Sequence, residues 1–140
     1  MIFDEIKQRV ESGGFAQHTG IEILEAHDGY AAGRIVLDQY HGNPIGSIHG
    51  GCIFTLVDTV AGTAFVSTGK ACTTLNATID FLNAAIESRE LTARAEPVRI
   101  GNHIAVFDVR VSDERGVLIS KSTVTFYVMK SAGILDGGKA

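Results

Sequence analysis

The sequence predicts an α+β domain in which one antiparallel sheet wraps around one helix. Residues 50 to about 66 are apolar nearly all round, which indicates a helix that is buried rather than laid on a surface. Residues 73–128 are rich in β-forming side chains. The connections between these strands are too short for parallel crossovers, so the strands form an antiparallel meander.

The N-terminal part of the chain predicts a helix and a hairpin. Apolar residues recur on one face of residues 1–13, and Gly13-Gly14 ends this helix. Strands are expected at 21–26 and 30–37, on either side of Asp28-Gly29. That dipeptide favours a tight turn because Gly accepts a positive φ.

The remaining elements follow from turn residues and alternation. Pro44 and the glycines of residues 41–47 predict a loop that leads into the central helix, which ends at Gly69-Lys70. Alternating apolar residues place Ala105, Phe107, Val109 and Val111 on one face of a strand. The predicted strands are 73–81, 91–100, 103–111 and 117–128. Residues 131–140, with three glycines, predict a flexible tail.

Composition limits the classes of function. A length of 140 residues and a mass of 14.9 kDa predict that residues 1–140 form a single domain. A formal charge of −4 and a pI near 5.7 argue against a nucleic-acid partner. No apolar run approaches the length of a membrane span, and the first residues lack a signal pattern. Two cysteines are too few for a disulfide scaffold, so we expect a cytoplasmic protein.

The start of the central helix and one carboxylate within it suggest chemistry. His49-Gly50-Gly51 begins the helix, and a helix N-terminus offers unpaired N–H groups and a positive dipole end to a developing oxyanion. Asp58 lies two turns further on among apolar residues, where an unpaired carboxylate is costly and normally has a functional reason. A polarising amide and a lone acid are the two parts that acyl transfer needs.

Three segments carry a family resemblance. They are Asn43 through His49-Gly50-Gly51 to Asp58, the strand 74–82 and the turn 99–103. Together they resemble the hotdog-fold acyl-CoA thioesterases, in particular the PaaI-like branch of the phenylacetate pathway. The resemblance implies a sheet of five to six antiparallel strands around the helix, and hydrolysis of acyl- or aryl-CoA thioesters. It implies no metal or added cofactor, since coenzyme A is part of the substrate, and it implies homodimers with a continuous sheet and often homotetramers.

The residues and the resemblance together suggest catalytic roles. We expect Asp58 to act as general base on water or as direct nucleophile, and the Gly50 N–H to polarise the thioester carbonyl. Asn43 resembles the residue that helps to hold the thioester or the water, although turn chemistry before Pro44 explains it nearly as well. His49 is an acid–base candidate with an equally good structural role in the loop.

Other residues are candidates for substrate contact. Thr74 falls where the family has a hydroxyl residue beside the acid, but Thr73 is one register away and faces the opposite side of the strand. Gly51 permits close approach of the ligand. The turn residues are candidates for contact with the pantetheine or the phosphates, with a plain hairpin turn as the equal alternative: Arg99, Gly101, Asn102 and His103.

Helix geometry adds a prediction about assembly. Gly50 and Asp58 are eight residues apart, a rise of about 12 Å along the helix. The thioester oxygen and the carbon under attack are neighbours, so both groups must reach nearly the same point. If both residues are catalytic, the Gly50 of one subunit must face the Asp58 of another in a dimer.

Several alternatives accompany this interpretation. Asn83-Ala84-Ala85 and Cys52 depart from the usual family residues, which affects the shape of the pocket. Cys52 beside His49 hints at a nucleophilic pair, although Cys52 more plausibly packs as a small apolar residue. The histidines and cysteines lack the spacing of metal ligands. Acyl-thioester dehydratases or hydratases and a non-catalytic acyl-CoA binder share the fold, and no residue decides between an aryl and a medium-chain acyl group.

Overall fold

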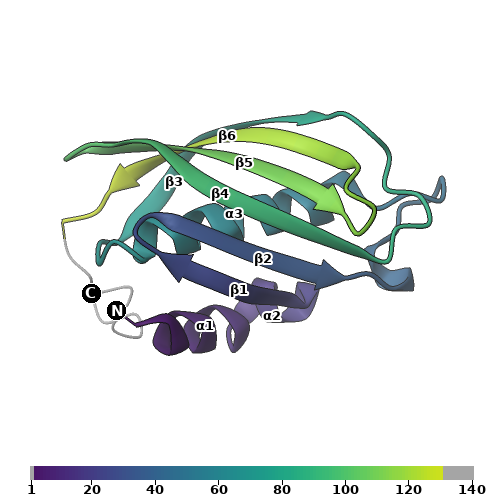
Figure 1. Cartoon of the computed structure of the whole chain (residues 1–140), viewed down its shortest axis with the longest axis horizontal. Coiled ribbons are helices and arrows are strands. Elements are labelled where there is room, and N and C mark those ends of the chain that lie inside the picture. Colours follow the sequence, from purple (N-terminus) through teal and green to yellow (C-terminus); the bar gives the residue numbers. More distant parts are fainter. Residues whose placement is uncertain (1, 131–140) are drawn as a thin grey trace.

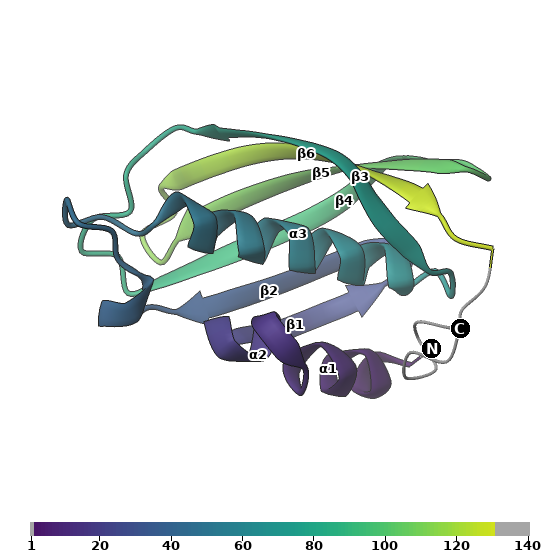
Figure 2. The ribbon, with the colours of Figure 1, turned by 180° about the vertical axis from the view of Figure 1, so that it is seen from behind.

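The fold is a six-stranded antiparallel sheet with one long helix on its inner face. The computed structural model describes residues 2–130, so the predicted tail at 131–140 lies outside the described residues. The strand order is β1-β2-β4-β5-β6-β3, and every neighbouring pair is antiparallel. Figures 1 and 2 show the sheet from its two sides, with α3 lying across it in the second view. This arrangement confirms the predicted fold class.

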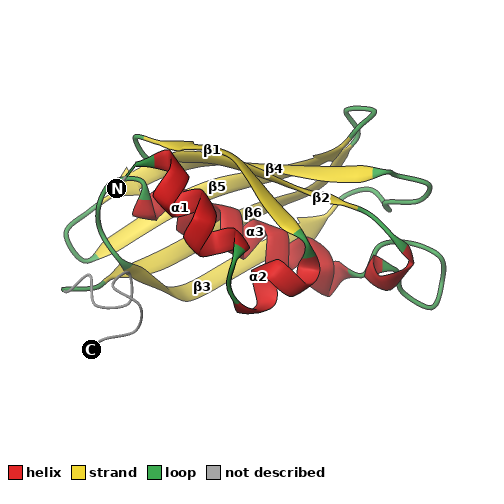
Figure 3. Ribbon diagram, turned by 90° about the horizontal axis from the view of Figure 1, so that it is seen from below, coloured by secondary structure: helices red, strands yellow, loops and turns green. Residues whose placement is uncertain are grey.

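The bounds of the elements agree closely with the predicted ranges. The helices are α1 (Phe3–Glu11), α2 (Gly14–Thr19) and α3 (Gly50–Val66), with a short 3-10 turn at Gln39–His41. The strands are β1 (Ile21–His27), β2 (Tyr30–Val36), β3 (Cys72–Phe81), β4 (Glu90–Ile100), β5 (Ile104–Asp113) and β6 (Leu118–Val128). Figure 3 shows α1 and α2 following one another beside α3. None of the described helices is long and apolar enough to cross a membrane.

The short helix α2 was not predicted. The two glycines were interpreted as the end of helical structure, but Gly14 only redirects the chain with a φ of +54° and the helix resumes. Gly20 then ends α2 in the left-handed region, and its N–H donates to the carbonyls of Ala16 and Gln17. A glycine pair therefore separates two helices here.

The prediction that α3 is buried rather than laid on a surface holds for one face of the helix only. One face is fully buried, and it includes Leu56, Val57, Val60, Ala61 and Ala64. The other face is only half-buried in the single chain, and it carries Thr55, Asp58, Thr59, Gly62 and Val66. The physical reason is that a sheet can curl around only part of a helix. The half-buried face therefore carries most of the helix's polar residues, Asp58 among them.

The core is centred on three phenylalanine rings that join α3 to β5 and β6. Phe65, Phe107 and Phe126 lie with ring centroids 5.8 to 6.1 Å apart, and two of the three contacts are edge-on. Such pairs each add about 0.5–1.5 kcal/mol beyond the burial of their area. The predicted alternation in β5 is confirmed, since Val109 and Val111 are fully buried like Phe107.

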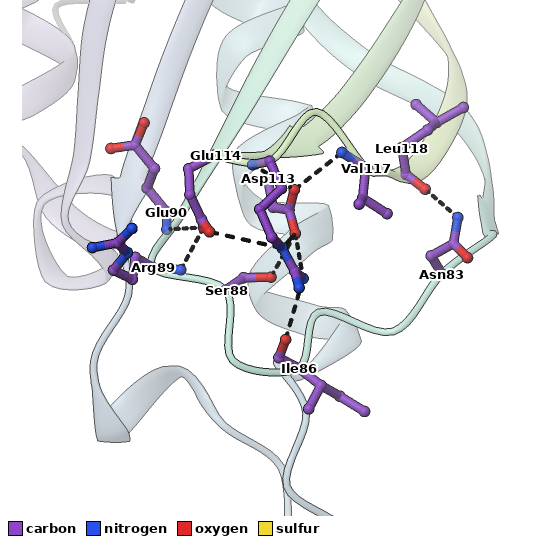
Figure 4. Close-up of polar contacts among 10 residues, drawn as sticks. Asn83, Ile86, Ser88, Arg89, Glu90, Asp113, Glu114, Val117 and Leu118 are labelled. Carbon is purple, nitrogen blue, oxygen red and sulfur yellow. Dashed lines mark hydrogen bonds and ion pairs between the residues drawn. The ribbon is translucent and has the colours of Figure 1, made fainter.

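A buried carboxylate fastens the β5–β6 turn to the segment that leads into β4 (Figure 4). The Asp113 side chain has no exposed area, and it accepts hydrogen bonds from the Arg115 guanidinium, the Ser88 hydroxyl and the Val117 N–H at 2.8 to 3.1 Å. Burial alone would raise the pKa of Asp113, but these donors outweigh it and lower the pKa from 3.8 to about 2. Glu114 adds a contact between the same two segments, because its Oε1 accepts a hydrogen bond from the Arg89 N–H.

We expect Asp113→Asn to lower the free energy of unfolding by about 2 kcal/mol at pH 7, because charged hydrogen bonds to a buried group are lost. The folded pKa lies below the unfolded value, so the contribution of the carboxylate is complete above about pH 5 and is lost as the pH falls toward 2. Urea unfolding at pH 7 and pH 3 should show the difference between wild type and variant shrink to roughly half.

Asp80→Asn is the matched control for this prediction, because Asp80 is exposed on β3. It should leave the free energy of unfolding unchanged within about 0.5 kcal/mol at both pH values. An Asp113→Asn variant as stable as wild type at pH 7 would contradict the role given to the buried carboxylate.

Candidate active site

Asp58 of α3 and Thr74 of β3 form a hydrogen-bonded pair. The Thr74 Oγ1 donates to the Asp58 Oδ1 at 2.8 Å. Thr74 pairs in register with Phe126, whose buried ring faces the helix, whereas Thr73 pairs with Tyr127 on the outer side. Thr74 is thus the threonine that contacts the acid, and the choice that the strand pattern left open is decided by the register.

A mostly apolar cavity of about 360 Å³ adjoins this pair. Its apolar lining comes from three elements that are distant in the sequence: Ile6 and Val10 of α1, Val66 of α3, and Phe126 of β6. Arg9 of α1 also lines the cavity. Sequence reasoning missed Arg9 because nothing in an amphipathic helix indicates which distant segment it will meet. A small apolar group that enters this cavity lies close to the Asp58 carboxylate.

The N-terminus of α3 has one amide that is free to bind a ligand. His49 is the N-cap, and its Nδ1 accepts from the Gly51 N–H at 2.8 Å. Among residues 2–130, the Gly50 N–H has no acceptor. A Cβ on Gly50 would lie 3.1 Å from the Phe81 ring, so a larger residue there would need this ring to shift by a few tenths of an ångström. The free amide and the positive end of the helix dipole therefore lie beside a cavity that Gly50 lines.

Asn43 holds the loop before α3 together. Its Oδ1 accepts from the N–H groups of Ile45 and Ser47, both at 3.0 Å, and its Nδ2 donates to the Ser47 Oγ at 2.8 Å. Turn chemistry, one of the two explanations offered for Asn43, therefore accounts for its side-chain contacts in the single chain. Asn43 also lines a second cavity of about 390 Å³, together with Gly50 and Phe81.

The two cysteines lie in surroundings that oppose a nucleophilic role. Burial raises the pKa of Cys52 to about 11, and the nearby charge of Asp38 adds to the increase. Burial and the charge of Asp58 raise the pKa of Cys72 to about 12. Thiolate is the reactive form of cysteine, so neither thiol is activated at neutral pH. The His49 Nδ1 is occupied by its helix cap.

The turn at residues 99–103 lies at the same end of the sheet as Thr73. In the sheet, Ile104 pairs with Tyr127, which in turn pairs with Thr73. The Gly101 N–H donates to the Ile104 carbonyl at 2.9 Å, and a Cβ on Gly101 would lie 2.8 Å from that oxygen. A hairpin turn therefore explains Gly101. Arg99, Asn102 and His103 are not part of the cavity beside Asp58.

Four of the predicted site residues thus fall into two separate groups in one chain, and His49 and Gly51 line a third cavity. Asp58 and Thr74 line the cavity beside α1, whereas Asn43 and Gly50 line the cavity beside Phe81. These two cavities share no residue. A single chain presents an acid at one place and a polarising amide at another.

Comparison with known proteins identifies the family. The sequence profile of the thioesterase superfamily matches residues 45–120. The acyl-coenzyme A thioesterase PaaI of Escherichia coli is 30% identical over 105 residues, which is 75% of each chain. The solved PaaI structure aligns with a TM-score of 0.85 at 24% identity, covering 94% of this chain and 98% of that one, and so shares the fold.

A second relative has been crystallised with coenzyme A. It is a hypothetical thioesterase of Streptococcus pneumoniae, with 31% identity, a TM-score of 0.74, and coverage of 79% of this chain and 86% of that one. Crystal structures also exist of two variants of that protein, in which alanine replaces an aspartate or a threonine 16 positions later. The family match extends over more than half of the present chain, from the loop before α3 into β6. The chain therefore belongs to the thioesterase superfamily and is a thioester hydrolase of the hotdog fold.

Proposed function

We propose that the protein hydrolyses acyl-CoA thioesters with an aryl or medium-chain acyl group to the free acid and coenzyme A. The observation that carries this proposal is the hydrogen bond between Asp58 and Thr74 beside a mostly apolar cavity. The two residues are 16 positions apart, the same spacing as the aspartate and threonine replaced in the Streptococcus pneumoniae relative. The substrate of PaaI and the coenzyme A bound to that relative support the substrate class.

In the proposed reaction, Asp58 activates a water molecule or attacks the thioester directly. Thr74 donates to one carboxylate oxygen and so orients the other oxygen toward the substrate. On the general-base route, the water oxygen bonds to the thioester carbon while Asp58 takes its proton. The tetrahedral intermediate then loses the coenzyme A thiolate, which receives the proton. Water is the only other reactant, so the proposal needs no metal or added cofactor.

The proposed site is completed by a second copy of the chain. The Gly50 N–H of one subunit binds the thioester oxygen, and Asp58 of the partner subunit acts on the carbon. The separation of the two cavities and the half-buried face of α3 support this arrangement. So does β3, which within residues 2–130 pairs with β6 alone and leaves Leu75 55% exposed. Pairing of two β3 edges would continue the sheet through a homodimer.

Other predicted residues have supporting roles in this proposal. Asn43 and His49 position the loop and the first turn of α3, through the contacts described above. Gly51 leaves room for the His49 ring at the start of α3, because a Cβ at residue 51 would lie 2.9 Å from that ring. Thr73 and the exposed turn around His103 contact the coenzyme A part of the substrate. They lie at one end of the sheet, where a long ligand can leave the cavity.

We expect Asp58→Asn to lower kcat by about 1,000-fold on every thioester that the wild type hydrolyses, because the amide cannot accept the proton. Thr74→Val should lower kcat roughly 10-fold because the hydrogen bond to Asp58 is lost, and Thr74→Ser should restore most of the rate. The measurement is thiol release from a panel of aryl-, short- and long-chain acyl-CoAs. Full turnover by Asp58→Asn would refute the assigned acid, and no turnover by wild type would favour a binder.

The shared site predicts complementation between two inactive variants. Gly50→Pro removes the amide proton, and the extended backbone of His49 (φ −62°, ψ 133°) is compatible with a following proline. Neither Gly50→Pro nor Asp58→Asn alone should turn over substrate. Mixed dimers contain one site with both groups intact, so refolding the two together should recover about a quarter of the wild-type rate per chain.

Gly50→Ala is the matched control for the complementation. It keeps the N–H but introduces the same contact with Phe81, so it measures the steric cost alone. Recovery only in the mixture supports a site built by two subunits. Absence of recovery, with mixed dimers demonstrated by a mass tag, would show that one subunit carries the complete site.

We expect the thiols to be inert in the folded protein. At pH 8, a pKa of about 11 leaves Cys52 about 100-fold less ionised than an ordinary thiol. Alkylation by iodoacetamide, followed by mass spectrometry, should be slower by about that factor in buffer than in urea. Cys52→Ser should keep turnover within about two-fold, and loss of turnover would restore the cysteine as a nucleophile candidate.

A further inference from the structure

Arg9 of α1 is the cationic side chain among the described residues that line the cavity beside Asp58. Ile6, Arg9 and Val10 follow the i, i+3, i+4 spacing of one helix face, and all three line this cavity. Ile6 is buried and Val10 is half-buried. An amphipathic helix normally keeps arginine on its opposite, polar face. Arg9 is thus a charged residue on the cavity side of α1.

The Arg9 guanidinium has no acidic partner among residues 2–130. Glu5 lies four residues earlier in α1, a spacing at which acids and arginines commonly pair, yet no ion pair joins these two described residues. Asp58 lines the same cavity, and within the described chain it is not paired with Arg9 either. The cavity therefore has an unpaired cation at one place and the proposed catalytic acid at another.

Two side chains on the neighbouring face of α1 fasten this helix to the edge strand β1. The Lys7 Nζ donates to the Ile23 carbonyl at 3.0 Å, and the Glu11 Oε2 accepts from the Ile23 N–H at 2.7 Å. The edge of a sheet exposes such backbone groups, so α1 occupies them in place of a further strand. Arg9 lies between the two anchoring residues in the sequence, and its backbone is therefore held beside the cavity.

The walls of the cavity suit a carbon chain. α1 lies alongside the C-terminal half of α3 (Figure 2). Asp58 and Val66 both line the cavity and are eight residues apart, a rise of about 12 Å along α3. Gly62 lies between them and contributes no side chain. Arg9 is exposed, so its guanidinium lies where the cavity meets solvent.

Building on the hydrolysis proposed above, we propose that Arg9 binds a carboxylate at the far end of the acyl group. The preferred substrates are then CoA thioesters of dicarboxylic acids. The thioester carbon lies at Asp58, the methylene chain contacts the apolar walls, and the terminal carboxylate reaches the guanidinium. An arginine fork binds a carboxylate through two parallel hydrogen bonds. A carboxylate at the solvent boundary keeps part of its hydration, which lowers the desolvation cost of the pair.

Two other uses of Arg9 give different results. An arginine that binds the phosphates of coenzyme A contributes equally to every CoA thioester, whatever its acyl group. An arginine that acts on the Asp58 carboxylate changes the rate and its pH profile for every thioester alike. The selectivity between matched acyl groups is the property that only recognition of the terminal carboxylate changes.

The first test compares kcat/KM within matched pairs, adipoyl-CoA with hexanoyl-CoA and suberoyl-CoA with octanoyl-CoA. We expect wild type to prefer the dicarboxylic member of each pair by about 10-fold and Arg9→Gln to lose this preference. Arg9→Lys keeps the charge without the fork and should retain part of it. Arg9→Glu should favour the ω-amino analogues instead. Added salt should weaken the wild-type preference.

Arg110→Gln is the matched control, because Arg110 is exposed on β5 and does not line the cavity. It removes the same charge and should leave the selectivity unchanged. Equal kcat/KM of wild type for both members of each pair would overturn the carboxylate site and leave the proposed hydrolysis intact. The same conclusion would follow if Arg9→Gln kept the wild-type ratio.

Binding to the Asp58→Asn variant separates this site from the proposed reaction. Isothermal titration of this variant measures affinity without turnover. Adipoyl-CoA should bind about 10-fold more tightly than hexanoyl-CoA, and adding Arg9→Gln should remove the difference. Equal affinities would refute the carboxylate site. A wild type that hydrolyses no thioester would refute the reaction, whereas the affinity ratio would still decide the role of Arg9.

Discussion

The packing of one face of α3 against the curled sheet is the constraint on which the rest of this structure depends. The buried face meets β5 and β6 through Phe65, Phe107 and Phe126, and this contact sets the depth and direction of the helix. Because the sheet covers only that face, the opposite face stays open. Among residues 2–130, the first turn of the helix also has no acceptor for the Gly50 N–H. The accessible Asp58 carboxylate and the free Gly50 amide both lie where the fold leaves α3 incompletely covered.

Two carboxylates illustrate how the fold treats charge in different places. Asp113 is fully buried, and four side-chain and backbone donors keep it ionised, so it acts as a fastening between loops. Asp58 is half-buried and has one described donor, Thr74. A carboxylate with fewer donors keeps an oxygen available for a proton or an electrophile. The number of donors distinguishes the structural acid from the acid proposed for catalysis.

The described chain leaves two surfaces incompletely covered. The Asp58 side of α3 is only half-buried, and within residues 2–130 the outer edge of β3 has no neighbouring strand. Both surfaces adjoin the proposed chemistry. An enzyme of this size gains a shared site and additional buried area by association, since a small domain covers only a limited part of its own surface.

The sequence by itself determined the elements whose signals are local. A nearly continuous apolar stretch located α3, Asp28-Gly29 located the first hairpin, and alternation located the inner face of β5, since each of these patterns depends on neighbours within a few residues. The same local signals concealed α2, because a glycine pair ends one helix and begins another here.

Only the tertiary structure decided the contacts between distant segments. It selected Thr74 over Thr73 through pairing with β6, brought Arg9 to the cavity beside Asp58, and left one face of α3 open. These outcomes depend on register and on which surfaces the sheet can reach. Register and coverage are properties of the whole packed chain, so no local pattern contains them.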